Sequence, residues 1–123
     1  MGCIVLTTDL SPESQRAFAP TCELADRLGL QVVLLAVLEE LPFEPTAGGM
    51  VATYPDRGQL RNDWEKRLKE LAATLRCQRP ARTALLDAMN VPHAIVEFAH
   101  KEKASYLAMA THGRTGLRRL LLG

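Results

Sequence analysis

The residues best suited to bind a ligand gather in the last stretch of the chain. An apolar run over 106–110 is followed by a turn that contains Gly113 and Gly116, and by a helix start. The unpaired backbone N–H groups of a helix start favour an anion, and glycines let the backbone approach it closely. Arg114 adds positive charge in the turn. The sequence therefore predicts a phosphate site here.

The spacing of the glycines excludes the two standard nucleotide motifs. Neither the G-x-G-x-x-G dinucleotide fingerprint nor the G-x-x-x-x-G-K-[ST] P-loop is present. The pattern is instead Ala110-x-x-Gly113, nine further residues and Gly123.

At these residues the chain resembles the universal stress protein family, whose nucleotide-binding members carry Gly-x-x-Gly, nine residues and Gly-Ser or Gly-Thr. Ala110 stands at the family's first glycine, and the sequence ends at Gly123, before the Ser or Thr. The resemblance extends to the N-terminal stretch 4–14 and, in outline, to everything between. It implies binding of ATP or a related adenine nucleotide such as AMP or ADP, and a homodimer.

The resemblance also implies a site, residue by residue. Thr7, Thr8 and Asp9 would border the adenosine part, and Val37 would meet the adenine through its backbone. The phosphates would be held by Ala110, Thr111, His112, Gly113, Arg114 and Gly123. Phosphates usually bring Mg²⁺, although no dedicated metal cage is visible in the sequence.

Several of these residues have a second interpretation. Asp9, directly after a strand, is also suited to capping the turn that follows. His112 would act as a general base or as a phosphate or solvent contact, and no nucleophile is paired with it. Arg118 and Arg119 fit a solvated helix face.

The elements that must position these residues alternate between two patterns. Apolar runs typical of buried parallel strands are 3–8, 31–38, 82–88 and 106–110, the third with the character of an edge strand. Amphipathic patterns predict helices over 12–28 and 59–76 and a short one after Asn90. Trp64 belongs to the core side of the second helix. The alternation predicts an α/β fold with an open parallel sheet, Rossmann-like in its layers.

The resemblance implies the strand order 3-2-1-4-5 of the adenine nucleotide α-hydrolase-like sheet, with the fifth strand absent from this sequence. Ligands in such sheets bind beyond the carboxyl ends of the strands where the order reverses, here between the first and fourth strands. The connection over 39–58, rich in proline and glycine, would be a flap over this site or a disordered insertion.

The first helix carries clear local signals. Ser11 is the expected N-cap and Pro12 the first helical residue. Pro20 falls inside the helix, where a proline costs on the order of 3 kcal/mol, so a kink is expected there. Gly29 is expected to end the helix.

Composition limits the class of protein. A chain of 123 residues, 47% hydrophobic, predicts a single domain over 1–123. A net charge of +1 with mixed signs implies no bulk attraction to nucleic acid or to an acidic membrane. The longest apolar run, 32–38, is too short to cross a bilayer.

The cysteines predict a reduced protein. Cys3, Cys22 and Cys77 are odd in number and widely spaced, which fits neither a disulfide framework nor a metal or redox motif. A reducing cytosol, and so a cytoplasmic location, is the simpler interpretation.

Three functions remain open. The first is a cytoplasmic stress-response module that binds an adenine nucleotide and signals through its shape or association. The second is a slow ATPase or phosphotransferase, although the sequence shows no catalytic residue, no Walker lysine and no base with a nucleophile. The third is an interaction protein of the same fold that binds no nucleotide, which Ala110 favours.

Overall fold

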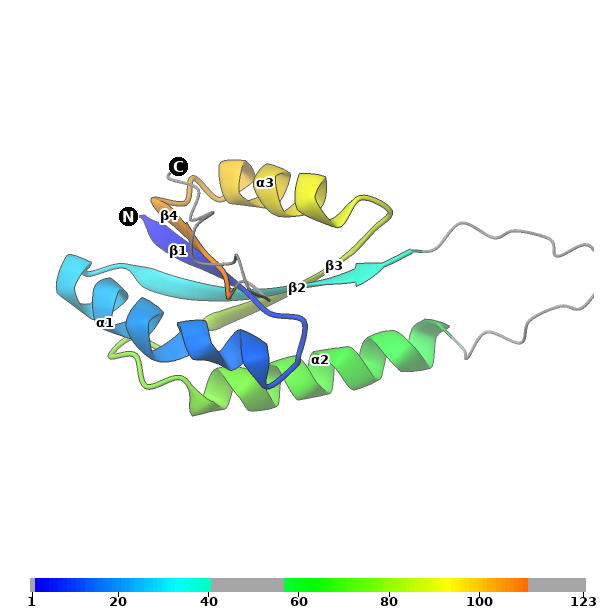
Figure 1. The fold of residues 1–123 in the computed structure, drawn as a ribbon, viewed down its shortest axis with the longest axis horizontal. Helices are drawn as coiled ribbons and strands as arrows, with labels where there is room; N and C mark the ends of the chain where they lie inside the picture. The colour runs from blue at the N-terminus through cyan, green and yellow to red at the C-terminus, as the bar shows by residue number, and fades with distance from the viewer. Residues whose placement is uncertain (1, 41–56, 111–123) are drawn as a thin grey trace, which may run out of the picture.

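The structure, a computed structural model, describes residues 2–40 and 57–110. Four parallel strands form one sheet in the order β3-β2-β1-β4. The strands are β1 Cys3–Thr7, β2 Gln31–Glu39, β3 Arg82–Ala88 and β4 Tyr106–Ala108 (Figure 1). The predicted open parallel α/β sheet and the order 3-2-1-4 are confirmed, with β3 at an edge.

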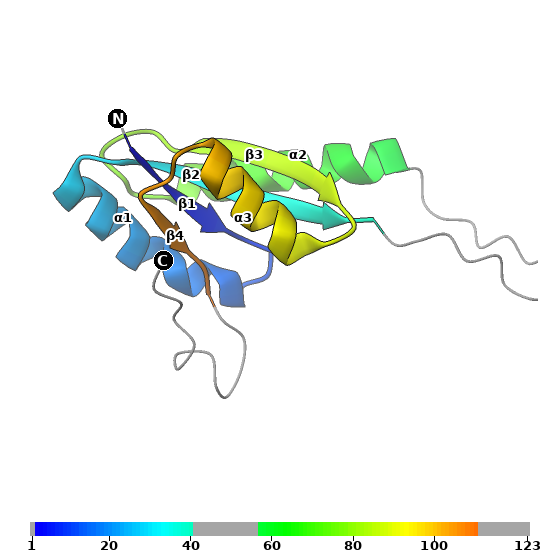
Figure 2. The same cartoon turned by 90° about the horizontal axis from the view of Figure 1, so that it is seen from above.

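Helices cover both faces of the sheet. The 3₁₀ helix η1 (Glu13–Ala17), α1 (Phe18–Leu28) and α2 (Arg57–Thr74) lie on one face, and α3 (Val91–Lys101) lies on the other (Figures 1 and 2). Alternate residues of β1 enter two separate cores: Ile4 packs under α1 and α2, and Val5 packs under α3. Strands covered on both faces have no polar side, which explains the continuous apolar runs of the sequence.

The last strand is less buried than predicted. Tyr106 is 49% exposed and Leu107 is 38% exposed, whereas a strand buried on both faces was expected. Within the described residues β4 pairs with β1 alone, so one of its sides lacks a neighbouring strand. Burial on both faces was the wrong expectation, because an apolar run reports the composition of a strand and not its place in the sheet. The strand order implied by the family resemblance, with the fifth strand absent, already put the fourth strand at an edge.

The start of the first helix also differs from the prediction. The chain forms η1 before α1, and Pro12 is the N-cap of η1 rather than the first residue of an α-helix. Pro20 therefore falls in the first turn of α1, where the backbone N–H groups have no intrahelical partner. The expected cost of an interior proline does not arise.

Other local predictions are confirmed. Gly29 ends α1 in the left-handed conformation, with φ of 67°. The Asn90 side chain accepts a hydrogen bond from His93 N and caps α3. Trp64 packs, partly buried, against the core under α2. Residues 41–56 of the predicted long connection lie outside the described residues.

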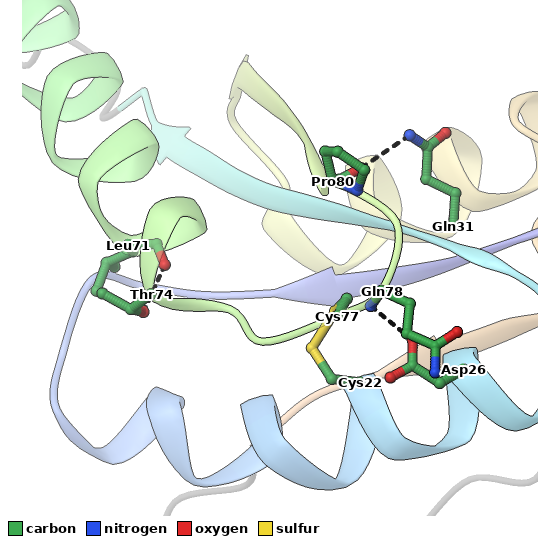
Figure 3. Close-up of a disulfide and its surroundings, with 8 residues drawn as sticks. All are labelled: Cys22, Asp26, Gln31, Leu71, Thr74, Cys77, Gln78 and Pro80. Atoms are coloured by element: carbon green, nitrogen blue, oxygen red, sulfur yellow. Dashed lines mark hydrogen bonds between the residues drawn. A yellow bond between two sulfur atoms is a disulfide. The ribbon is translucent and has the colours of Figure 1, made fainter.

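The cysteine interpretation was wrong. Cys22 in α1 and Cys77 in the connection between α2 and β3 form a disulfide, and Cys3 is a buried free thiol (Figure 3). The two partners are 55 residues apart, and packing of the connection against α1 brings them together, so no local motif marks them. The spacing of the cysteines therefore gives no support for a reducing compartment.

No helix within the described ranges combines the length and the apolar character needed to span a membrane.

Candidate functional site

A hollow of about 150 Å³ opens at the carboxyl ends of the central strands. Its lining comes from five places in the fold: the end of β1, the carboxyl half of β2, the segment after β4, η1 and α3. The lining residues are Thr7, Thr8, Asp9, Ser14, Leu35, Val37, Val91, Ile95 and Ala110. The hollow lies where the strand order reverses between β1 and β4, which is where open α/β sheets bind ligands.

The predicted site residues divide into two groups. Thr7, Thr8, Asp9, Val37 and Ala110, which stand far apart in the sequence, line this one hollow. The others lie outside the described residues: Thr111, His112, Gly113, Arg114 and Gly123. Their proposed contacts with phosphate therefore stay predictions.

The floor of the hollow is fixed by a hydrogen-bond network around Thr8. Its backbone N–H donates to Leu35 O at 2.9 Å, which ties the loop after β1 to β2. Its side-chain oxygen accepts from Leu10 N at 3.0 Å and lies 2.7 Å from Ser14 Oγ. Thr8 and Ser14 are both buried, and among the described residues no buried side-chain N or O atom lacks a partner. Such a network holds the loop in one conformation.

The direction of the hydrogen bonds in this network follows from Ser14. The Ser14 hydroxyl donates to Ser11 O at 2.7 Å, so its single proton is already engaged. Thr8 must then donate to Ser14 Oγ while it accepts from Leu10 N. The chain of bonds runs in one direction, from Leu10 N–H through both hydroxyls to the Ser11 carbonyl.

Leu10 follows the strand end in an unusual conformation. Its φ of 69° lies in the left-handed region, which costs a non-glycine residue about 1–2 kcal/mol. The side chain is only 6% exposed and belongs to the core under α1, and its N–H is bonded to Thr8. Burial and this hydrogen bond hold the strained turn beside the hollow.

Asp9 shows the capping contact that was one of its two interpretations. Its carboxylate accepts from Ser11 N at 2.9 Å and from the Ser11 hydroxyl. The residue is exposed and also lines the hollow, so the turn contact leaves the carboxylate at the edge of the site.

The opposite wall is apolar, and its residues on α3 were missed from the sequence. Val91 and Ile95 lie on α3, one helical turn apart, and line the hollow together with Leu35 and Val37 of β2. The spacing of four residues after the Asn90 cap is the signal that would have placed both side chains on one face. The pattern does not reveal that this face of α3 lines the hollow at the strand ends.

The charge of the described lining is small. Asp9 is its only ionisable residue, and Lys, Arg and His are absent from it. Residues 2–40 and 57–110 contain no group of three or more His, Cys, Asp or Glu residues that would hold a metal ion. The described part of the site is thus a small apolar slot with hydroxyl groups and one carboxylate at its edge.

Comparison with known proteins gives consistent results. A family model described as "Universal stress protein family" matches residues 1–123. Universal stress protein MJ0531 of Methanocaldococcus jannaschii is 30% identical over 122 residues, which cover 98% of this chain and 70% of that protein.

Solved structures share the fold. A protein from the universal stress protein family of Burkholderia pseudomallei superposes with a TM-score of 0.68 at 19% identity, covering 97% of this chain and 86% of its own. A universal stress protein in complex with cAMP has a TM-score of 0.52 at 17% identity, covering 86% of this chain and 69% of its own.

Proposed function

The chain belongs to the universal stress protein family, and we propose that it binds an adenine nucleotide in the hollow between β1 and β4. The observation that carries the proposal is the convergence of Thr7, Thr8, Asp9, Val37 and Ala110 on that single hollow. The hollow also lies at the reversal point of the sheet, where this class of fold takes its ligands.

The chemistry of the walls suits an adenosine. The apolar side chains of Val37, Val91 and Ile95 offer surface for the faces of a purine ring. Asp9 and the hydroxyl of Thr7, at the edge of the same hollow, offer hydrogen-bond partners for a ribose. The structural neighbour in complex with cAMP supports the choice of an adenine nucleotide.

ATP is the nucleotide we propose first, with ADP and AMP as related ligands. The phosphates would extend from Ala110 toward the predicted turn at Gly113. The described lining supplies one carboxylate, Asp9, so Mg²⁺ would be held mainly by the phosphates and water, as this ion often is.

The proposed role is that of a stress-response binding module whose shape or association depends on the bound nucleotide. Adenine nucleotides are abundant inside cells, so we propose that the protein acts in the cytoplasm. The family resemblance is the basis on which we propose a homodimer. No described residue makes the pairing of base and nucleophile that hydrolysis of ATP would need, so we do not propose turnover as the main activity.

The test is a calorimetric titration with ATP, ADP, AMP and cAMP, each with and without Mg²⁺. In the Ala110→Leu variant a branched side chain fills part of the hollow, which should weaken binding by about tenfold or more. Ala73→Leu is the matched control, because Ala73 is an exposed residue of α2 that does not line the hollow. Its affinity should stay within about twofold of the wild-type value.

Two outcomes would contradict the proposal. Absence of binding heat with all four nucleotides would favour the interaction protein that binds none. Equal nucleotide affinities of the two leucine variants would show that the nucleotide binds outside this hollow.

A further inference from the structure

The disulfide lies beside a second hollow, away from the proposed nucleotide site. This hollow of about 570 Å³ is formed by α1 and by the end of α2 with the segment that follows it. Cys22 lines it, next to Phe18 and Ala19 on α1 and opposite Leu75. Cys22 is only 5% exposed, yet it is one of the residues that line this open hollow.

We propose that the Cys22–Cys77 bond is a thiol–disulfide exchange site, at which a low-molecular-weight thiol enters this hollow and attacks Cys22. The proposal is independent of nucleotide binding. It rests on the disulfide, on the hollow that Cys22 lines, and on the contacts that keep Cys77 in place.

The reaction balances with a dithiol as the reductant. Its thiolate forms a bond to Cys22 Sγ, and the electron pair of the Cys22–Cys77 bond leaves with Cys77 as a thiolate, which takes up a proton. The second thiolate of the reductant then attacks the sulfur already bound to Cys22, and Cys22 leaves and is protonated. The protein disulfide gains two electrons and two protons, and the dithiol becomes a disulfide.

The position of Cys77 suits it to be the leaving group. It belongs to the connection between α2 and β3 and is only half-buried, so its thiolate is released toward water. Cys22 sits within α1, on a fixed backbone. Release of the Cys77 thiolate therefore requires no movement of the helix.

Two hydrogen bonds keep the connection attached when the disulfide is open (Figure 3). Gln78 N–H donates to Asp26 Oδ1 at 2.9 Å, one helical turn from Cys22 on α1. Gln31 Nε2 donates to Pro80 O at 3.0 Å, from the start of β2. Because these contacts are made by residues that closely follow Cys77 and involve no sulfur, the two thiols stay close and the bond can form again.

The third cysteine provides an internal reference. Cys3 is buried under α3, lines neither hollow, and its Sγ contacts Glu102 O at 3.8 Å. Burial raises the pKa of its thiol, and the Glu102 charge adds to this rise. Cys3 should stay unreactive under conditions that open the disulfide.

The experiment measures the rate of disulfide opening by dithiothreitol in the folded protein, with alkylation of the freed thiols and mass spectrometry of the peptides. We expect a rate that rises linearly with dithiothreitol concentration and alkylation at Cys22 and Cys77 before Cys3. Ala19→Phe, which narrows the hollow, should slow opening by about tenfold or more because access limits exchange. Ala73→Phe, on the exposed face of α2 and outside the lining, should stay within about twofold of wild type.

Urea unfolding of each variant separates access from stability. A rate that saturates with dithiothreitol would overturn the proposal, because opening would then be limited by the rate of unfolding. A rate that stays linear but follows the free energy of unfolding across the variants would overturn it as well, because the bond would then react only in the unfolded population. Equal slowing by the two phenylalanine variants would also overturn it.

A second measurement uses Cys77→Ser, which leaves Cys22 as an unpaired thiol on a residue that lines the hollow. Treatment of the folded variant with glutathione disulfide should produce a mixed disulfide at Cys22 and none at Cys3. A folded variant that is modified at neither cysteine would contradict the entry of thiols through the hollow.

Discussion

Thr8 is the residue on which the floor of the nucleotide hollow depends. Its hydroxyl is the only partner of the buried Leu10 N–H in the network, and it also donates to Ser14. Leu10 is strained, so the loop needs this bond to keep its conformation. A ligand that contacts Thr7, Thr8 and Asp9 therefore meets a preformed surface.

We expect Thr8→Val to lower the free energy of unfolding by about 1–3 kcal/mol, because an isosteric side chain leaves a buried N–H without its acceptor. Nucleotide affinity should fall as well, since the loop loses its fixed form. Urea unfolding and calorimetry give the two values. Thr74→Val is the control: Thr74 is exposed, its hydroxyl donates to Leu71 O one turn earlier in α2, and the expected loss is under about 0.5 kcal/mol. Equal losses in the two variants would contradict the role of the network.

Individual site residues could be predicted from the sequence where they stand at a strand end. Thr7, Thr8 and Asp9 stand at the end of one apolar run, and Ala110 stands at the end of another. Their position at strand ends and the family resemblance both indicated them as site residues. Ser14 and Ile95 were missed for a physical reason: the first lies in a 3₁₀ turn that the pattern assigned to an α-helix, and the second reads as core. Which core residue borders a cavity depends on packing between elements, and periodicity does not report it.

The helices and strands are largely explained by local rules. Gly29 ends α1 because it alone among the neighbouring residues takes the left-handed conformation without strain. The replacement of the first α-helical turn by η1 shows the limit of these rules. Ser11 Oγ does accept from Ser14 N, at 3.3 Å, as a cap would. The Ser14 hydroxyl, however, is engaged with Thr8, and that contact belongs to the tertiary structure.

Gly29→Ala should lower the free energy of unfolding by about 1 kcal/mol, through the backbone alone. No atom lies within 4 Å of the position that its Cβ would take, so steric clash adds nothing. Gly29→Asn should cost less, because asparagine tolerates the left-handed conformation better than alanine does. Urea unfolding of the three proteins checks the order. An asparagine variant as unstable as the alanine variant would show that the helix end is held by something other than conformational preference.

The alternation of strands and helices in the sequence predicts only part of the arrangement of the whole chain. Parallel strands and covering helices follow from the alternation, and the order 3-2-1-4 came from the family resemblance. The Cys22–Cys77 bond followed from neither, because it links a helix to a connection 55 residues away. The contact exists only once α1 and α2 have packed on the same face of the sheet.

This bond should stabilise the protein as a long-range crosslink. The Cys22→Ser, Cys77→Ser double variant should lose roughly 2–4 kcal/mol of unfolding free energy, since closing a loop of this length restricts the unfolded chain. Wild-type protein in reductant should show a similar loss, and the double variant should not respond to reductant. Thermal unfolding with and without dithiothreitol makes the comparison. A double variant as stable as the oxidised protein would show that the crosslink contributes nothing.

The pairing of β1 with β4 has a consequence for synthesis of the protein. Ile4 lies opposite Tyr106, so β1 is made before a partner strand that is translated roughly a hundred residues later. At 5–20 residues per second, the ribosome needs roughly 5–20 s to bridge that interval. During this time one edge of β1, whose residues Ile4, Val5 and Leu6 end up fully buried, has no neighbour. The nascent chain is therefore most vulnerable to wrong pairing of this edge just before β4 emerges, and that is the period in which a chaperone would be of most use to it.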